Sequence, residues 1–198
     1  MKKPFLKFIE TELGSRFVLI ACGLPSTGKS GAMREIARVT GYPVFRSDLI
    51  RLEVLKGQDV FDEKVASDMS KRNAVYDEMF TQADEALKKN EGIILDATFI
   101  SQSLRRRAAE IAAGHRLPFI IVETVCPPEI ALDRIRKRAE KDYESNALTE
   151  QAYLNNKKVF EKVDLTDLKN HYLMLPVTHI VVDTTRDNDW YVTSVEKR

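Results

Sequence analysis

The sequence predicts a single α/β domain, built on a doubly wound parallel sheet of five strands with helices on both faces. Five short runs rich in Val, Ile and Phe alternate with longer stretches of helical spacing, and a glycine loop follows the first run. The runs cover residues 17–22, 42–45, 92–96, 118–125 and 178–183. Apolar runs without polar alternation indicate strands buried on both faces, and their alternation with helices indicates βαβ units.

The helical stretches separate these runs, and the longest carries Val75, Met79 and Ala83 at the spacing of one helix face. The stretches cover residues 32–39, 49–55, 65–89, 101–113, 128–141 and 149–163. No repeat or linker-like segment interrupts the 198 residues, so we expect one domain over residues 1–198.

Composition limits the classes of partner. The net charge is +1, with 43% hydrophobic and 31% charged residues, so no overall basic field favours strong nucleic-acid or membrane binding. The two cysteines, Cys22 and Cys126, are expected to be reduced thiols beside buried strands. Neither a signal peptide nor an apolar segment long enough to span a membrane is apparent, so the cytoplasm is the expected location.

The first apolar run enters a loop with the spacing Gly-x-x-x-x-Gly-Lys-Ser, which predicts a phosphate-binding loop. Glycine lets backbone N–H groups turn toward phosphate oxygens, and the following helix presents its positive end. Lys29 would reach the terminal phosphates, and the Ser30 hydroxyl would bind Mg²⁺. The alternative is an ordinary strand-to-helix turn. The predicted nucleotide-binding residues are Gly23, Leu24, Pro25, Ser26, Thr27, Gly28, Lys29 and Ser30.

The nucleotide is expected to be ATP, because the guanine-reading pattern Asn-Lys-x-Asp of GTPases is not found. The nearest match, residues 156–159, lacks the aspartate. We therefore expect ATP and Mg²⁺ as cofactors.

The second apolar run leads into Asp48 and Arg51, which share one helix face because they are three residues apart. A carboxylate at this edge can orient an acceptor hydroxyl and take its proton, and the arginine can hold an anionic or polar substrate. The alternative is that Asp48, or Ser47, caps the helix.

The third apolar run ends in Asp96, followed by Thr98. A buried strand ending in aspartate looks like a Walker B element, whose carboxylate holds Mg²⁺ through water, and Thr98 is expected beside the substrate. The alternative is that Asp96 or Thr98 caps the next helix.

Together, GLPSTGKS, RSDLIR and VYDEMF…ILDATF resemble the P-loop small kinases of the polynucleotide-kinase and gluconate-kinase type, many of which are ATP-binding proteins of unassigned substrate. The resemblance covers about residues 17–185. It implies a three-layer P-loop NTPase sandwich with a five-stranded parallel sheet and a small helical lid at about 134–150. It also implies that Lys29 and Ser30 bind MgATP, that Asp48 is the base, that Arg51 binds substrate and that Asp96 lies near the metal.

The same resemblance implies two further elements. Arg134 and Arg138, one helical turn apart, match the lid arginines that close over the phosphates; the alternative is a solvated basic face paired with Asp133 and Glu140. The turn at residues 183–186 resembles the segment that lies against adenine. Gly31 departs from the family, where Thr or Ser is frequent, and predicts a looser first helical turn.

The sequence therefore predicts an ATP-dependent phosphotransferase that moves the γ-phosphate of MgATP to a hydroxyl of a small molecule or nucleotide end. One alternative is an ATP-binding regulatory or toxin-like module that controls a partner. Another is a 5′-hydroxyl polynucleotide kinase, which the near-neutral charge does not favour. The acceptor itself is not named by any motif.

Overall fold

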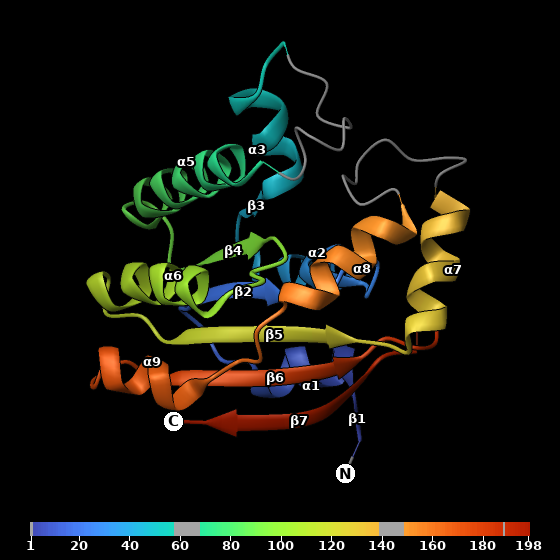
Figure 1. The fold of residues 1–198 in the computed structure, drawn as a ribbon. Helices are drawn as coiled ribbons and strands as arrows, with labels where there is room; N and C mark the ends of the chain where they lie inside the picture. The colour runs from blue at the N-terminus through green and yellow to red at the C-terminus, as the bar shows by residue number, and fades with distance from the viewer. Residues whose placement is uncertain (1, 58–67, 139–148, 188) are drawn as a thin grey trace.

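The computed structural model describes residues 2–57, 68–138, 149–187 and 189–198, and in it a seven-stranded mixed sheet lies between helices on both faces (Figure 1). The sheet order is β1-β7-β6-β5-β2-β4-β3. The strands are β1 (Lys3–Pro4), β2 (Val18–Cys22), β3 (Val44–Arg46), β4 (Ile93–Asp96), β5 (Phe119–Val125), β6 (Val177–Asp183) and β7 (Tyr191–Lys197).

All five predicted strands are confirmed, and they form the parallel part of the sheet, β3-β4-β2-β5-β6. The prediction that the sheet has five strands, all parallel, was wrong. β7 adds antiparallel to β6, and the two-residue β1 adds antiparallel to β7. The sequence analysis did not predict β7, because Val192 is its one buried residue and the strand, which is mostly exposed, contains no apolar run.

The helices in the described part of the chain are α1 (Phe5–Glu12), α2 (Lys29–Thr40), α3 (Ser47–Val54), α5 (Met69–Leu87), α6 (Gln102–Gly114), α7 (Pro128–Arg138), α8 (Glu150–Val159) and α9 (Leu165–His171). α1 and α9 were not predicted, and the expected helix over 149–163 ends at Val159. No helix among the described residues has the length and apolarity needed to cross a bilayer.

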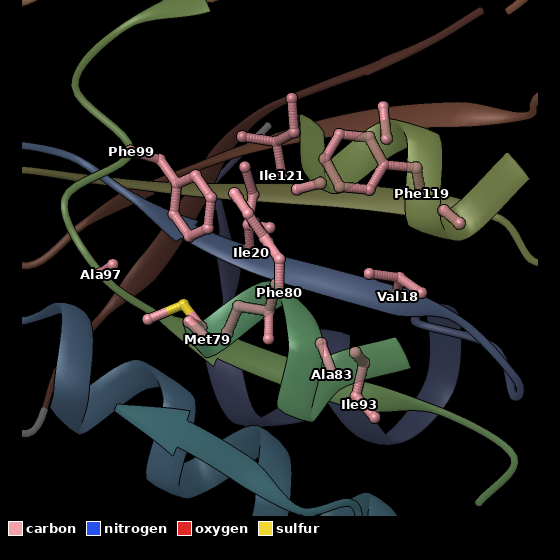
Figure 2. Close-up of a cluster of buried hydrophobic side chains, with 14 of the residues drawn as sticks. Val18, Ile20, Met79, Phe80, Ala83, Ile93, Ala97, Phe99, Phe119 and Ile121 are labelled. Atoms are coloured by element: carbon pink, nitrogen blue, oxygen red, sulfur yellow. The ribbon is translucent and has the colours of Figure 1, made fainter. Parts of the chain in front are cut away.

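Two apolar cores hold the layers together, one on each face of the sheet. Val18 and Ile20 of β2 join the core beneath α5, α6 and α9, whereas Leu19 and Ala21 join the core beneath α1 and α2. Figure 2 shows the first core, where Met79, Phe80 and Ala83 of α5 lie over side chains of β2, β4 and β5. The alternation along β2 explains why this strand reads as a continuous apolar run.

The parallel strands bring the predicted site residues to one edge of the sheet. β2 lies between β4 and β5, and β4 lies between β2 and β3. Arg46, the last residue of β3, is in register with Asp96, the last residue of β4. The glycine loop, Asp96 and the start of α3 therefore follow the carboxyl ends of three neighbouring strands, where ligands of open α/β sheets bind.

Candidate active site

The glycine loop has backbone conformations that its two glycines make possible. Gly23 has φ 128° and Gly28 has φ 87°, in the region that side-chain-bearing residues rarely adopt. A β-carbon at Gly23 would also stand 2.5 Å from the backbone oxygen of Thr124. Gly28 is the N-cap residue of α2, whose first turn contains no acidic residue. The loop therefore leads directly into the positive N-terminal end of α2, and no acidic side chain in the first turn of the helix offsets that charge.

Threonine hydroxyls fasten this loop to the neighbouring strands. Thr27 Oγ1 donates to the backbone oxygen of Leu24 (2.8 Å) and lies 2.8 Å from Thr124 Oγ1. Thr184 Oγ1 donates to the backbone oxygen of Thr27 (2.7 Å). Sequence reasoning assigned nothing to Thr124 and placed Thr184 only in the turn expected beside adenine, not in contact with the loop. Their one signal was that they stand at or just after the ends of β5 and β6.

Lys29 lies folded onto its own loop. Its Nζ donates to the backbone oxygen of Leu24 (2.7 Å). This contact places the ammonium across the loop that the sequence predicts to hold phosphates. Ser30 is the next residue of α2 and is partly exposed. The predicted MgATP residues therefore stand together at the helix start.

Two carboxylates meet beside this loop. Asp48 lies in the first turn of α3, and burial raises the pKa of its carboxyl above the ordinary value. The nearby Asp96 carboxylate raises the pKa of Asp48 further, whereas the charges of Lys29, Arg46 and Arg51 lower it. The structure thus brings together Lys29, Asp48, Asp96 and Arg51, as the sequence predicts, and adds Arg46.

Arg46 was overlooked because its partner is distant in sequence. Its Nε lies 3.7 Å from Asp96 Oδ2, and the two side chains are 22% and 5% exposed. The cation offsets the cost of the Asp96 carboxylate in an almost buried position. Its one signal was its place as the last residue of a predicted strand.

The helix-capping alternatives do not match the structure. Arg46 occupies the N-cap position of α3, so neither Ser47 nor Asp48 caps it. Ser101 caps α6 by accepting from the Leu104 backbone N–H, so Asp96 and Thr98 do not. Thr98 is partly exposed two residues after β4.

Arg51 lies on α3 one turn after Asp48. Its Nε and Nη1 atoms are buried and have no hydrogen-bond partner within the described residues. Burial lowers the pKa of Arg51, and the charge of Asp48 acts in the opposite direction.

Arg134 does not belong to a solvated helix face. Its side chain is 17% exposed, and its Nη2 donates to the backbone oxygen of Thr184 (2.6 Å) and to Asp187 Oδ1 (2.9 Å). Its Nη1 also donates to the backbone oxygen of Ser26 (3.5 Å). Arg134 therefore links α7 to the glycine loop and to the turn after β6, which the sequence predicts beside adenine.

The rest of the predicted lid is described only at its edges. Residues 139–148 lie outside the described residues, as does the side chain of Arg138, the last residue of α7. Arg136 fits the solvated alternative, because its side chain is 65% exposed and pairs with Glu150. The lid at about 134–150 remains a prediction.

The basic run Arg105–Arg107 has structural partners. Arg105 is fully buried and donates to the backbone oxygens of Glu161 (2.7 Å) and Lys162 (3.1 Å). Arg106 pairs with Asp167, and Arg107 pairs with Asp77 and lies over the Phe80 ring. These contacts bind α6 to its neighbours.

Gly31 is explained by the ring that covers it. A β-carbon at Gly31 would stand 2.6 Å from Cη2 of Trp190, and that indole also lies 6.1 Å from the Phe5 ring. The prediction of a loose first turn omitted this contact, because Trp190 precedes β7, far along the chain. The Thr or Ser that is frequent at this position in the family would have no space for its side chain beside Trp190.

Comparison with known proteins places this geometry in a family. The model of an AAA domain family matches residues 18–163. None of the curated proteins matches the chain. Among solved structures, a gluconokinase from Sinorhizobium meliloti 1021 shares 16% identity, with 86% of this chain and 84% of that chain covered and a TM-score of 0.56. A putative kinase from Chloroflexus aurantiacus shares 18%, with 87% of each chain covered and a TM-score of 0.60.

A third similar structure is a chain of the PezAT chromosomal toxin-antitoxin system of Streptococcus pneumoniae. It shares 11% identity, with 96% of this chain and 77% of that chain covered and a TM-score of 0.58. At these identities the likeness is one of fold. The family match and the kinase folds confirm the resemblance to P-loop small kinases drawn from the sequence.

Proposed function

Since the chain belongs to this AAA domain family and has the fold of P-loop small kinases, we propose that it is an ATP-dependent phosphotransferase acting on a hydroxyl. The observation that carries the proposal is the partly buried Asp48 carboxylate, which lies close enough to Lys29 and Asp96 for their charges to change its pKa. A protein that only binds nucleotide has no need of a second carboxylate, partly buried, beside the phosphate loop.

ATP would bind along residues 23–30, with its phosphates at the start of α2. The ammonium of Lys29 would exchange the Leu24 oxygen for a terminal phosphate oxygen, an acceptor that carries more negative charge. The loop needs little rearrangement, because Thr124 and Thr184 already hold it. Arg134 would keep the adenine-side turn in place and, if α7 closes, add positive charge near the phosphates.

In the transfer step, Asp48 would accept the proton of the acceptor hydroxyl while that oxygen forms a bond to the γ-phosphorus. The bond between the γ-phosphorus and the β,γ-bridging oxygen breaks, and ADP leaves with the electron pair. The raised pKa of Asp48 makes it a better proton acceptor than an exposed aspartate. Arg51 would hold the acceptor beside Asp48, and Thr98 would contact it.

Magnesium fits the oxygen ligands at this edge. The Ser30 hydroxyl and, through water, the Asp96 carboxylate would hold it, and hard oxygen donors are the ligands that Mg²⁺ prefers. When bound with ATP, it neutralises charge on the β- and γ-phosphates. Arg46 lies beside Asp96, with 3.7 Å between Nε and Oδ2, and offsets the cost of burying that carboxylate.

The test is transfer from γ-labelled ATP to a metabolite library and, in parallel, to oligonucleotides with 5′-hydroxyl ends. Labelled product from a small molecule would support the proposal, and product from the oligonucleotides alone would favour a polynucleotide kinase. ATP binding without transfer to any acceptor would favour the regulatory or toxin-like module. Asp48→Asn is the control in each arm, because contaminating kinase activity would survive it.

A further inference from the structure

The turn between β4 and α6 contains one residue whose backbone is strained. Phe99 has a left-handed conformation, with φ 43°. A bulky residue rarely adopts this conformation, which is costly and persists only where surrounding contacts hold it. The Phe99 side chain is fully buried and belongs to the same core cluster as Ile20 and Phe80 (Figure 2). The strained residue directly follows Thr98, at the edge of the sheet where the candidate site lies.

Side chains from two other elements hold the peptide groups of Phe99. The backbone N–H of Phe99 donates to the Tyr76 hydroxyl (3.2 Å), and its backbone oxygen accepts from Cys22 Sγ (3.8 Å). The Tyr76 and Phe99 rings also meet edge to face, with 5.5 Å between their centroids. Because a thiol is a weak donor, the contact with Tyr76 of α5 is the stronger of the two. Without this hydroxyl, the buried Phe99 N–H loses its acceptor, which favours a change in the turn.

The turn leaves Thr98 partly exposed between buried neighbours. Residues 92–97, 99 and 100 are all buried. Asp96, on one side, is fixed by the pairing of β4 with β3. The backbone oxygen of Ile100, on the other side, accepts a backbone hydrogen bond (3.0 Å) from the segment after α8. Since both sides are fixed, the direction of the Thr98 side chain depends on the backbone conformation of Phe99.

We infer that Tyr76 is a positioning residue for the proposed transfer: its hydroxyl holds Phe99 in the left-handed conformation and thereby places Thr98 beside the acceptor. Tyr76 itself is buried and acts through the turn, not by contact with the acceptor. Misplacing a contact group by about 1 Å can lower a rate by about 10²-fold, even when the altered residue is far from the chemistry. The alternative is that Tyr76 only fills the core, as its neighbour Phe80 does. The role of Thr98 rests on the proposed function, whereas the hold on Phe99 does not.

The chain contains the same arrangement at the opposite edge of the sheet. Arg16 also has a left-handed backbone (φ 59°), and its backbone N–H donates to the Tyr42 hydroxyl (2.8 Å). Arg16 lies just before β2, at the amino ends of the parallel strands, whereas the candidate site lies at their carboxyl ends. Tyr42→Phe removes the same atom from the same kind of contact away from the site. It is therefore the matched control for Tyr76→Phe.

The structural arm of the test is independent of transfer and measures amide hydrogen exchange by NMR. Tyr76→Phe keeps the ring, and circular dichroism checks that the variant folds. We expect exchange at the Phe99 amide to accelerate about tenfold more than exchange at the Ile94 amide of β4, because only the Phe99 amide loses its acceptor. Tyr42→Phe should leave the Phe99 amide unchanged. Equal acceleration at the two amides in Tyr76→Phe would mean that Tyr76 only stabilises the fold as a whole, and would overturn the inference.

The transfer arm uses the acceptor that gives most product when the metabolite library and the 5′-hydroxyl oligonucleotides are screened with γ-labelled ATP. In Tyr76→Phe, kcat/KM for this acceptor should fall about tenfold or more, because Thr98 is displaced. The KM for MgATP should stay within about twofold, since the turn does not include the glycine loop. Tyr42→Phe should leave both values unchanged.

A double-mutant cycle with Thr98→Ala shows whether Tyr76 acts through Thr98. If it does, adding Tyr76→Phe to Thr98→Ala should lower kcat/KM little further, because the contact that Tyr76 positions is already absent. Losses that multiply, or a kcat/KM that Tyr76→Phe leaves unchanged, would contradict the positioning role. If the wild type phosphorylates no acceptor but the Phe99 amide responds to Tyr76→Phe as expected, the proposed function fails and the hold on Phe99 stands.

Discussion

The guanidinium of Arg46 lies beside the carboxylate of Asp96, with 3.7 Å between Nε and Oδ2, and this pair joins the ends of β3 and β4. Burial is the main cause of the raised pKa of Asp48; in addition, the charge of Asp96 raises this pKa and the charge of Arg46 lowers it. The two groups of the pair therefore act in opposite directions on the proton affinity of the proposed base.

Replacing Arg46 by Gln should move the acidic limb of the pH profile of kcat/KM to higher pH. The substitution removes a charge that lowers the pKa of Asp48, so this carboxyl stays protonated, and inactive as a base, over a wider acidic range. The measurement is transfer rate against pH. Arg38→Gln, which removes an exposed cation paired with Glu35 on α2, is the control and should leave the limb in place. A limb that moves to lower pH would contradict the assigned balance.

Lys29→Ala should weaken ATP binding by about tenfold or more, since the ammonium makes charge-assisted hydrogen bonds to phosphate. The substitution also removes the hydrogen bond from Lys29 to the Leu24 backbone oxygen in the nucleotide-free protein, which by itself would favour ATP binding. This bond to a neutral oxygen is weaker than the bonds to phosphate. Calorimetry with ATP measures the change, and Lys88→Ala removes an exposed cation elsewhere as the control. Unchanged ATP affinity in Lys29→Ala would refute the phosphate role of the loop.

Arg134→Gln should lower both stability and ATP affinity, whereas Arg136→Gln should change neither appreciably. Arg134 donates to the backbone oxygens of Thr184 and Ser26 from a mostly buried position, so its loss should cost about 1–3 kcal/mol of unfolding free energy. Arg136 forms an exposed pair with Glu150, and its removal should stay within about 0.5 kcal/mol. Urea unfolding and ATP titration give the two values. Equal effects of the two substitutions would show that Arg134 has no anchoring role.

Gly31→Ala should destabilise the protein, although glycine-to-alanine changes inside helices ordinarily stabilise by about 0.5–1 kcal/mol. The added carbon would meet Trp190 Cη2 at 2.6 Å, and overpacking of this kind costs about 1–3 kcal/mol. Trp190→Phe removes that ring atom and should restore part of the loss. A double-mutant cycle from thermal or urea unfolding measures the coupling; additive effects of the two substitutions would mean that the contact is unimportant.

The parts of the fold that could be predicted from sequence are those whose signal is local. The five parallel strands have apolar runs, which are most continuous in β2, β4 and β5 because both faces of these strands are buried. The glycine loop has fixed spacing because its backbone conformation requires glycine. β7 escaped prediction because an edge strand with one buried residue, Val192, has no such run. α9 is too short at seven residues to show a clear helical period.

The candidate site also contains residues that local sequence patterns predict and contacts that they do not. Lys29, Ser30, Asp48 and Asp96 were predicted because each stands at the end of a predicted strand or soon after it, and the structure places them at one edge of the sheet. The supporting contacts were not visible, because they join segments distant in the chain. The Arg46–Asp96 pair, the Thr184 anchor of the loop and the Trp190 cover on Gly31 are three such contacts.

The most direct test of the proposed reaction separates ATP binding from transfer in Asp48→Asn. Asparagine keeps the size of the side chain but cannot take the acceptor proton, so ATP affinity should stay within about threefold of wild type. The transfer rate to the best acceptor should fall by about 10²–10⁴-fold, the factor by which a general base usually accelerates a reaction. Asp77→Asn, a change of the same chemistry on the exposed face of α5, is the control and should keep full activity. Loss of transfer with ATP binding intact is the predicted result, and full transfer activity in Asp48→Asn would contradict the account.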